Sequence, residues 1–476
     1  MPLNLTNIII RGRRALLCAA ALACALLPAP AAAHTRVERA SPADGDTAHG
    51  AVHEVRLRFT RPVESELTTI TLFRGTAQVA AGARKVEESE GREFVLALSA
   101  PLQPGDYVAR WKTVGGDGHV LEGAWRFAVA AVAAPSAVPA GTDASAGLAQ
   151  APPPPPTTDG TDEALEEEVG EAGRPLAVAV RWAWFVSLLG MIGAVAFRFG
   201  VLPRLDGDPE LQPVSARAEA AVWFVALGAA ALSVAALFAR LWMQVAALGG
   251  GEAAWDGARM QVLLRDTGWG LAWVLQAIAT LAFVTGLFIT KAPHGRSVGW
   301  MGSAAGAVLL SAVPALSGHA ASVGRMNGVA ILMDTVHVLG AGVWLGTLAA
   351  LLAVGIPAAL LSGPGAGGAV AAMVRAFSPM ALAGAAAVGV TGVVNVLFQL
   401  DAVPDLWGTG YGRALLLKLA LLAGVGALGF YNWRRVLPVL GDDPGTRRLR
   451  TSARAELGLG LVVLLVTAVL VALPTP

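Results

Sequence analysis

Cysteine is nearly absent from this chain of 476 residues, and the two that occur, Cys18 and Cys24, lie in one N-terminal apolar run. If that run is removed on export, the mature protein has no thiol. Disulfides, thiolate zinc sites and thiolate copper sites are then excluded, which leaves His, Met, Asp and Glu as metal ligands. Charge is also scarce, at 14% of residues with a net charge of +1, so charge gives no indication of nucleic-acid binding.

The N-terminal segment has the pattern of a secretory signal peptide over residues 1–33. Basic residues precede an apolar run at 15–27, and an Ala-x-Ala site follows at 31–33. Cleavage after Ala33 would make His34 the first residue of the mature protein. Two alternatives are a lipoprotein anchored through Cys24 and an uncleaved membrane anchor.

Residues 34–130 have the pattern of a small all-β domain. Five short segments alternate or are rich in β-branched and aromatic residues, with turn-rich stretches between them: 55–59, 69–73, 94–98, 107–111 and 124–129. We expect a sandwich or Greek-key barrel. The next segment, 131–174, is rich in Pro and Ala and is expected to be an extended linker.

The remainder, 175–476, is predicted to be an all-α polytopic membrane bundle. Hydrophobic residues make up 55% of the chain, and its mean hydropathy is +0.59. About eight apolar runs are long enough to cross a bilayer; they are 176–200, 219–246, 269–290, 299–319, 328–353, 378–400, 412–432 and 456–473.

The basic residues predict the orientation of this bundle in the membrane. If the β-domain is exported, an even number of crossings returns the C-terminus to the outer side. Most basic residues of the bundle then fall on the cytoplasmic side, as the positive-inside rule requires. They are Arg198, Arg204, Arg217, Lys291, Arg296, Arg375, Arg434, Arg435, Arg447, Arg448, Arg450 and Arg454.

Two features of the exported part predict a metal site. A free N-terminal His34 offers an amine and an imidazole from one residue, a chelating pair that suits Cu(II). Asp117-Gly118-His119 places a carboxylate and an imidazole two residues apart in an extended segment.

The segments around these residues resemble the CopC copper-binding family over nearly all of 34–130. They are His34-Thr35 through Ser41-Pro42-Ala43-Asp44-Gly45, Arg58-Phe59-Thr60-Arg61-Pro62-Val63, and Gly116-Asp117-Gly118-His119 with Gly123 and Phe127.

The resemblance implies a cupredoxin-like β-barrel that binds Cu(II) through His34, Asp117 and His119. Arg61 stands where some family members have a further carboxylate, so a fourth ligand would come from Glu64 or water. Segment 34–130 has no methionine, so we expect it to bind Cu(II) only.

A second metal site is predicted within the stretch Leu316–Gly346, which carries His319 and His337 in apolar surroundings, with Met333 and Asp334 nearby. Ionisable side chains inside a bilayer are costly and mark an ion, proton or cofactor path. As a copper site, His337, Met333 and His319 would be ligands and Asp334 would orient an imidazole. Alternatively, Asp334 and His337 form a polar pair that holds helices together. Haem fits less well, because the two histidines lie at different depths.

Several segments of the membrane part resemble the CopD family. They are 266–270, 317–320, 334–337 with 343–346, 377–379, 391–392, 411–413 with Lys418, and 454–457. The resemblance implies a copper-handling inner-membrane protein of copper uptake or resistance. Two further charged residues in the spans, Lys418 and Glu456, could lie on the copper path or serve as helix anchors.

The leading hypothesis is a non-enzymatic protein that captures Cu(II) outside the cytoplasm and passes copper into or across the membrane. Its partners would be copper ions, the lipid bilayer and a cytoplasmic or periplasmic copper chaperone. No P-loop, phosphorylation-type aspartate motif or large cytoplasmic domain supplies ATP, so gradients or cytoplasmic copper binding would drive movement. The oxidation state of copper in the membrane stays open. The alternatives are a copper-resistance buffer or sensor that does not transport, and a membrane electron-transfer protein.

Overall fold

The computed structural model separates the chain into two compact units, one of β-sheet and one of helices. The structure describes residues 35–115, 120–131, 175–249, 257–316, 327–363, 366–400, 402–440 and 443–473.

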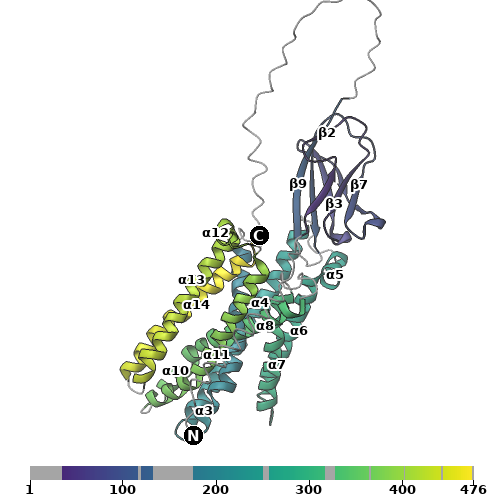
Figure 1. Ribbon diagram of the computed structural model, residues 1–476. Helices are drawn as coiled ribbons and strands as arrows, with labels where there is room; N and C mark the ends of the chain where they lie inside the picture. Colours follow the sequence, from purple (N-terminus) through teal and green to yellow (C-terminus); the bar gives the residue numbers. More distant parts are fainter. Residues whose placement is uncertain are drawn as a thin grey trace, which may run out of the picture. The chain divides into compact units, whose positions relative to one another are not determined.

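The β unit consists of two sheets, as the sequence predicted for an all-β domain (Figure 1). One has the strand order β1-β3-β7-β6, with bounds Val37–Ser41, Glu54–Phe59, Glu93–Ala97 and Arg84–Lys85. The other has the order β2-β9-β8-β4-β5, with bounds Asp46–Ala48, Val120–Val129, Gly105–Val114, Thr69–Arg74 and Ala77–Gly82. Neighbouring strands are antiparallel except for the parallel pair β2 and β9.

The core of the β unit lies between these sheets because the strands alternate apolar and polar residues. In β3, Val55, Leu57 and Phe59 are fully buried, while the residues between them face outward. From the other sheet, Ile70 and Leu72 of β4 are also fully buried in the same cluster. A period of two puts one set of side chains into the core and the other toward solvent.

The predicted copper motif, residues 117–119, belongs to the connection between strands β8 and β9, which form a hairpin. The two strands pair from Gly105 with Val129 to Val114 with Val120. Beside the end of β8, the backbone N–H of Glu64 donates to the Val114 carbonyl over 2.9 Å. Glu64 is thus fixed next to the start of the loop that joins the two strands.

Among the described residues of the helical unit, eight helical spans are long and apolar enough to cross a membrane, in agreement with the sequence. Their main helices are α2 Pro175–Ala196, α4 Gln212–Gly249, α6 Gly268–Ile289, α7 Arg296–Leu316, α8 Asn327–Ala341, α11 Ala366–Gln399, α13 Gly410–Tyr431 and α14 Asp443–Leu470. Shorter helices are α3 Pro203–Asp206, α5 Gly257–Asp266, α9 Thr347–Ala350, α10 Ile356–Leu360 and α12 Asp405–Gly408. Short π-helical and 3-10 stretches are η5 Phe197–Val201, η8 Gly342–Gly346, η9 Leu351–Gly355, η10 Asn432–Val436 and η11 Leu437–Val439.

Glycines let the helix carrying the predicted membrane site approach its neighbours at backbone distance. A Cβ atom added to Gly340 of α8 would lie 2.9 Å from the Gly384 carbonyl oxygen of α11. A Cβ on Gly193 of α2 would lie 2.1 Å from the Gly346 carbonyl carbon of η8. Close approach of this kind is typical of small residues at helix interfaces in membranes. The α8–η8 helix therefore packs against α11 and α2 with no side chain between the backbones.

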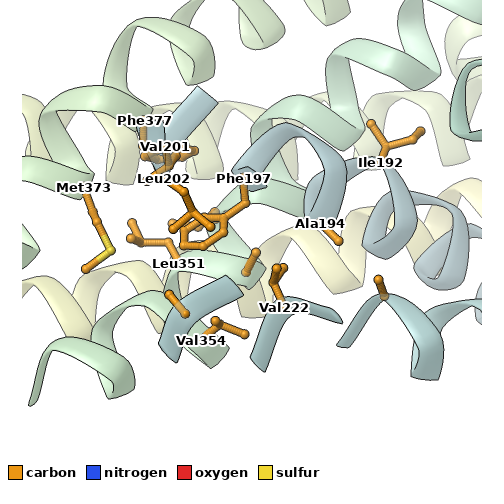
Figure 2. Close-up of a cluster of buried hydrophobic side chains, with 14 of the residues drawn as sticks. Ile192, Ala194, Phe197, Val201, Leu202, Val222, Leu351, Val354, Met373 and Phe377 are labelled. Carbon is orange, nitrogen blue, oxygen red and sulfur yellow. The ribbon is translucent and has the colours of Figure 1, made fainter. Parts of the chain in front are cut away.

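An apolar cluster beyond this crossing joins α2, η5, η9 and α11. Figure 2 shows Phe197 and Leu202 beside Leu351, Val354 and Met373 in this cluster. All five residues are buried, with Phe197, Leu202 and Met373 at 0% exposure. The cluster contains no charged group, so it supports the helices and is not a candidate site.

Candidate functional site

The residues predicted for the membrane site lie on α8, and its helical geometry brings them together. Asp334 and His337 are three residues apart and Met333 and His337 four apart, so all three project toward one side of the helix. Each is half-buried. The neighbouring helix α11 lies beside α8 and runs in the opposite direction (Figure 1).

The imidazole of His337 is held by α11. Its Nδ1 atom lies 3.0 Å from Thr391 Oγ1, and the Thr391 hydroxyl donates to the Ala387 carbonyl over 2.6 Å. Because that hydroxyl proton is used, Thr391 can accept from Nδ1–H of the ring, and the Val388 backbone also bonds to the ring. In the tautomer with its proton on Nδ1, the Nε2 lone pair is available for a metal ion.

Gly392 of α11 lies directly beside this ring. A Cβ atom added there would lie 3.6 Å from His337 Cε1 and 4.0 Å from Nδ1. Glycine therefore lets the ring lie directly on the backbone of α11. The adjacent residues Thr391 and Gly392 orient the ring by a hydrogen bond and by contact.

Asp334 has different partners. Its Oδ1 atom accepts from Asn395 Nδ2 of α11 over 3.4 Å, a long bond. The Lys418 ammonium on α13 interacts electrostatically with the Asp334 carboxylate and with the His337 ring. Among the described contacts, no hydrogen bond joins Asp334 to His337. Asp334 and His337 each bond to α11, and with Lys418 of α13 they form a polar group drawn from three helices.

These groups lie near one end of the bundle. Asp334 and Lys418 come about two turns after the starts of α8 and α13, and Asn395 about one turn before the end of the oppositely directed α11. The arrangement provides an imidazole nitrogen, a carboxylate and a nearby thioether, a donor set that suits a transition metal. Lys418 supplies a positive charge that balances the carboxylate.

A second polar cluster lies farther along the same helix. The buried Glu456 of α14 accepts from Trp344 Nε1 of η8 over 3.2 Å and from Asn432 Nδ2 of η10 over 2.9 Å. We call Glu456, Trp344 and Asn432 the Glu456 cluster. The sequence singled out Glu456 but could not identify its partners, which lie 112 and 24 residues away.

The charge of Arg240 on α4 is held by aromatic rings and an amide. Its Cζ atom lies 4.3 Å from the ring centroid of Trp184 and 5.9 Å from that of Trp269, and its Nη1 donates to Gln276 Oε1 over 2.8 Å. Cation–π contacts of this kind stabilise a desolvated guanidinium. Arg240 therefore joins α2, α4 and α6 and has the partners of a packing residue.

Several predicted ligands lie outside the described residues. His34 precedes the first described residue, Asp117 and His119 belong to the connection between β8 and β9, and His319 follows α7. Their geometry stays a prediction, as does the role of Asp334 in orienting an imidazole. Within the part of the chain that the structure describes, no three His, Cys, Asp or Glu side chains are grouped closely enough to hold a metal ion.

Comparison with protein families gives three matches along the chain. The model described as "CopC domain" matches residues 37–130. The model described as "Copper resistance protein D-like, N-terminal domain" matches residues 171–329, and "Copper resistance protein D" matches residues 371–470.

The chain is also similar to individual proteins. It is 26% identical to copper transport protein CutJ from Bacillus subtilis (strain 168) over 458 residues, covering 94% of this chain and 76% of that protein. A crystal structure of CopC from Methylosinus trichosporium OB3b is 31% identical and covers 20% of this chain and 94% of that chain, with a TM-score of 0.20. PcoC, a methionine-rich copper resistance protein from Escherichia coli, is 20% identical and covers 20% of this chain and 98% of that chain, with a TM-score of 0.18.

Proposed function

The chain joins a CopC domain to a CopD membrane domain, as its sequence predicted, and we propose that this multi-pass membrane protein imports copper. In this proposal the β unit captures Cu(II) on the periplasmic side and the helical unit passes copper toward the cytoplasm. The similarity to a protein named as a copper transport protein, over 94% of this chain, favours transport over buffering alone. Residues 1–33 would be a signal peptide and 131–174 a linker.

Capture is assigned to His34, Asp117 and His119, the residues that match the family's Cu(II) motif. Glu64 is a candidate for a further oxygen ligand, because its backbone is fixed beside Val114, just before the loop that carries Asp117 and His119. A site of nitrogen and oxygen ligands without thioether suits Cu(II) better than Cu(I).

Passage through the membrane is assigned to His337, and its orientation by Thr391 is the observation that carries the proposal. An imidazole whose Nδ1–H is engaged presents Nε2 as a ligand, and an outer hydrogen bond of this kind is usual for metal-binding histidines. Met333, one turn away, offers a thioether as a further copper ligand. His319 would complete the set near the mouth of the path.

Lys418 and Asp334 supply the charge balance for such a site. A carboxylate inside an apolar bundle needs a compensating charge, and the Lys418 ammonium provides it before copper arrives. A copper ion at His337 would take over that role, since it brings positive charge close to the same carboxylate. The negative charge of Asp334 would thus be balanced by Lys418 when the site is empty and also by copper when the site is occupied.

A cellular experiment separates import from external buffering or sensing. Cytoplasmic copper is measured in cells that express the intact chain, His337→Asn, or a deletion of 34–130, at matched expression. Import predicts raised copper with the intact chain, and no increase with His337→Asn. Equal copper in the intact chain and His337→Asn, with sensitivity only in the deletion, would contradict import and favour a buffer or sensor.

A further inference from the structure

Glu456 is a buried acid for which copper binding gives no role. Among the described residues it is the least exposed Asp, Glu, Lys or Arg, with 4% of its surface accessible. Its carboxylate accepts two hydrogen bonds, from the indole of Trp344 and the amide of Asn432, and both donors are neutral. A Cβ atom on Gly429 of α13 would lie 3.4 Å from Oε1, so the adjacent helix leaves room for the carboxyl group.

Among the described residues, no cation forms a salt bridge with this carboxyl group. The basic residues on the elements packed against α14, and on α14 itself, are Arg181, Arg375, Arg413, Lys418, Arg434, Arg435, Arg447, Arg448, Arg450 and Arg454; the other titratable residues there are Asp443, Tyr411 and Tyr431. Arg181 donates to the Ala468 carbonyl, three turns from Glu456. Lys418 lies 14 residues, or about 21 Å, from Asn432 along the α13–η10 helix. Arg375, Arg434, Arg435 and Arg454 are exposed.

The cluster can hold the carboxyl group with or without a proton. An ionised carboxyl group buried without a cation is costly, and one proton removes its charge. Trp344 donates to Oε1 in either state. Asn432 donates to the ionised oxygen, and if its amide turns over, its Oδ1 accepts from the protonated one. That Oδ1 atom has no partner of its own in the described part of the chain, so no competing bond fixes the amide.

The cluster is also aligned with the membrane copper site. Asp334, His337 and Trp344 follow one another at separations of three and seven residues, which places them along one face of the α8–η8 helix. Trp344 lies about 10 Å beyond His337 at 1.5 Å per residue. A copper ion at His337 is therefore close enough for its charge to act on the Glu456 carboxyl group through the apolar interior of the bundle.

We propose that Glu456 is a proton-binding site that couples copper movement to proton movement, an inference that rests on the proposed import function. As the copper cation approaches, its charge favours the ionised carboxylate; the O–H bond of Glu456 breaks and the proton passes to water on the side from which copper enters. After copper leaves toward the other side, the carboxylate takes up a proton from that side, so one proton moves in the direction opposite to copper. No electron is transferred, and one proton is exchanged for each passage.

The test uses the purified full-length protein in lipid vesicles that contain a pH-sensitive dye, with copper uptake measured in parallel. For the intact protein we expect copper uptake with a copper-dependent proton signal, and a rate that changes between mildly acidic and mildly alkaline buffer. Glu456→Gln keeps an acceptor for Trp344 but cannot titrate; it should lose the proton signal and the pH dependence. Glu456→Asp should retain both, and the exposed Glu210→Gln should behave like the intact protein.

The outcomes distinguish the two proposals. Copper uptake by the intact protein without a proton signal would overturn the coupling and leave import standing, whether or not Glu456→Gln folds. An unchanged proton signal in Glu456→Gln would likewise overturn it. Absence of copper uptake by the intact protein would overturn import itself, and with it the coupling.

Discussion

Replacing Thr391 by valine tests the assignment of His337 as a copper ligand without touching the ligand itself. Valine has nearly the shape of threonine but removes the oxygen that lies 3.0 Å from His337 Nδ1. The ring then loses its hydrogen bond to Thr391 and keeps only its bond to the backbone of Val388, so its orientation is less firmly fixed. Loss of such an outer hydrogen bond typically weakens metal affinity about 10- to 100-fold, which corresponds to about 1.4 to 2.8 kcal/mol.

The assay is a competition titration of Cu(I) against a chelator, on full-length protein in which His119→Ala removes the exported site. Thr467→Val is the matched control, because the Thr467 hydroxyl makes the same kind of bond within its helix, to Val463 over 2.8 Å, and no described contact with a histidine. We expect weaker binding in Thr391→Val only. Unchanged affinity, or an equal loss in the control, would refute the assignment.

Two further substitutions test the packing and the charge balance around this site. Gly384→Ala places a Cβ 2.6 Å from the Gly340 carbonyl oxygen. Because such overpacking costs about 1 to 3 kcal/mol, we expect a lower Tm. The control Gly389→Ala, where a Cβ meets nothing within 4 Å, should leave Tm unchanged. Asp334→Asn leaves the Lys418 ammonium without its counter-charge and should lower Tm more than the double substitution Asp334→Asn with Lys418→Met; equal losses would show that the two charges are not coupled.

The sequence predicted most of the fold because two hydrophobic patterns are strong: the alternation of apolar residues in the strands and the long apolar runs of the membrane spans. Strands β3, β4, β7, β8 and β9 and all eight apolar spans agree with the expected segments. Strands β1, β2, β5 and β6 were not predicted. They are short or rich in Ala and Gly, and most of their residues are exposed, so they carry no clear alternating pattern.

The site was predicted only along α8. Spacing along one helix places Asp334 and His337 on the same side, but it cannot identify partners from other helices. Thr391 lies 54 residues from His337, and Asn395 lies 61 residues from Asp334. A threonine and an asparagine in an apolar span give no signal of their own, because such residues also bond within their own helix. The Thr391-Gly392 pair within the family resemblance was the one available indication.

Copper uptake into vesicles that contain only the purified protein tests the central claim most directly. The rate of uptake is compared between the intact chain, His337→Asn and His294→Asn. His294 is an exposed histidine with a φ of 61°, a conformation that asparagine tolerates. Import through the membrane site predicts uptake by the intact chain and by His294→Asn, and its loss in His337→Asn. Equal uptake by all three proteins, or by none, would contradict the account.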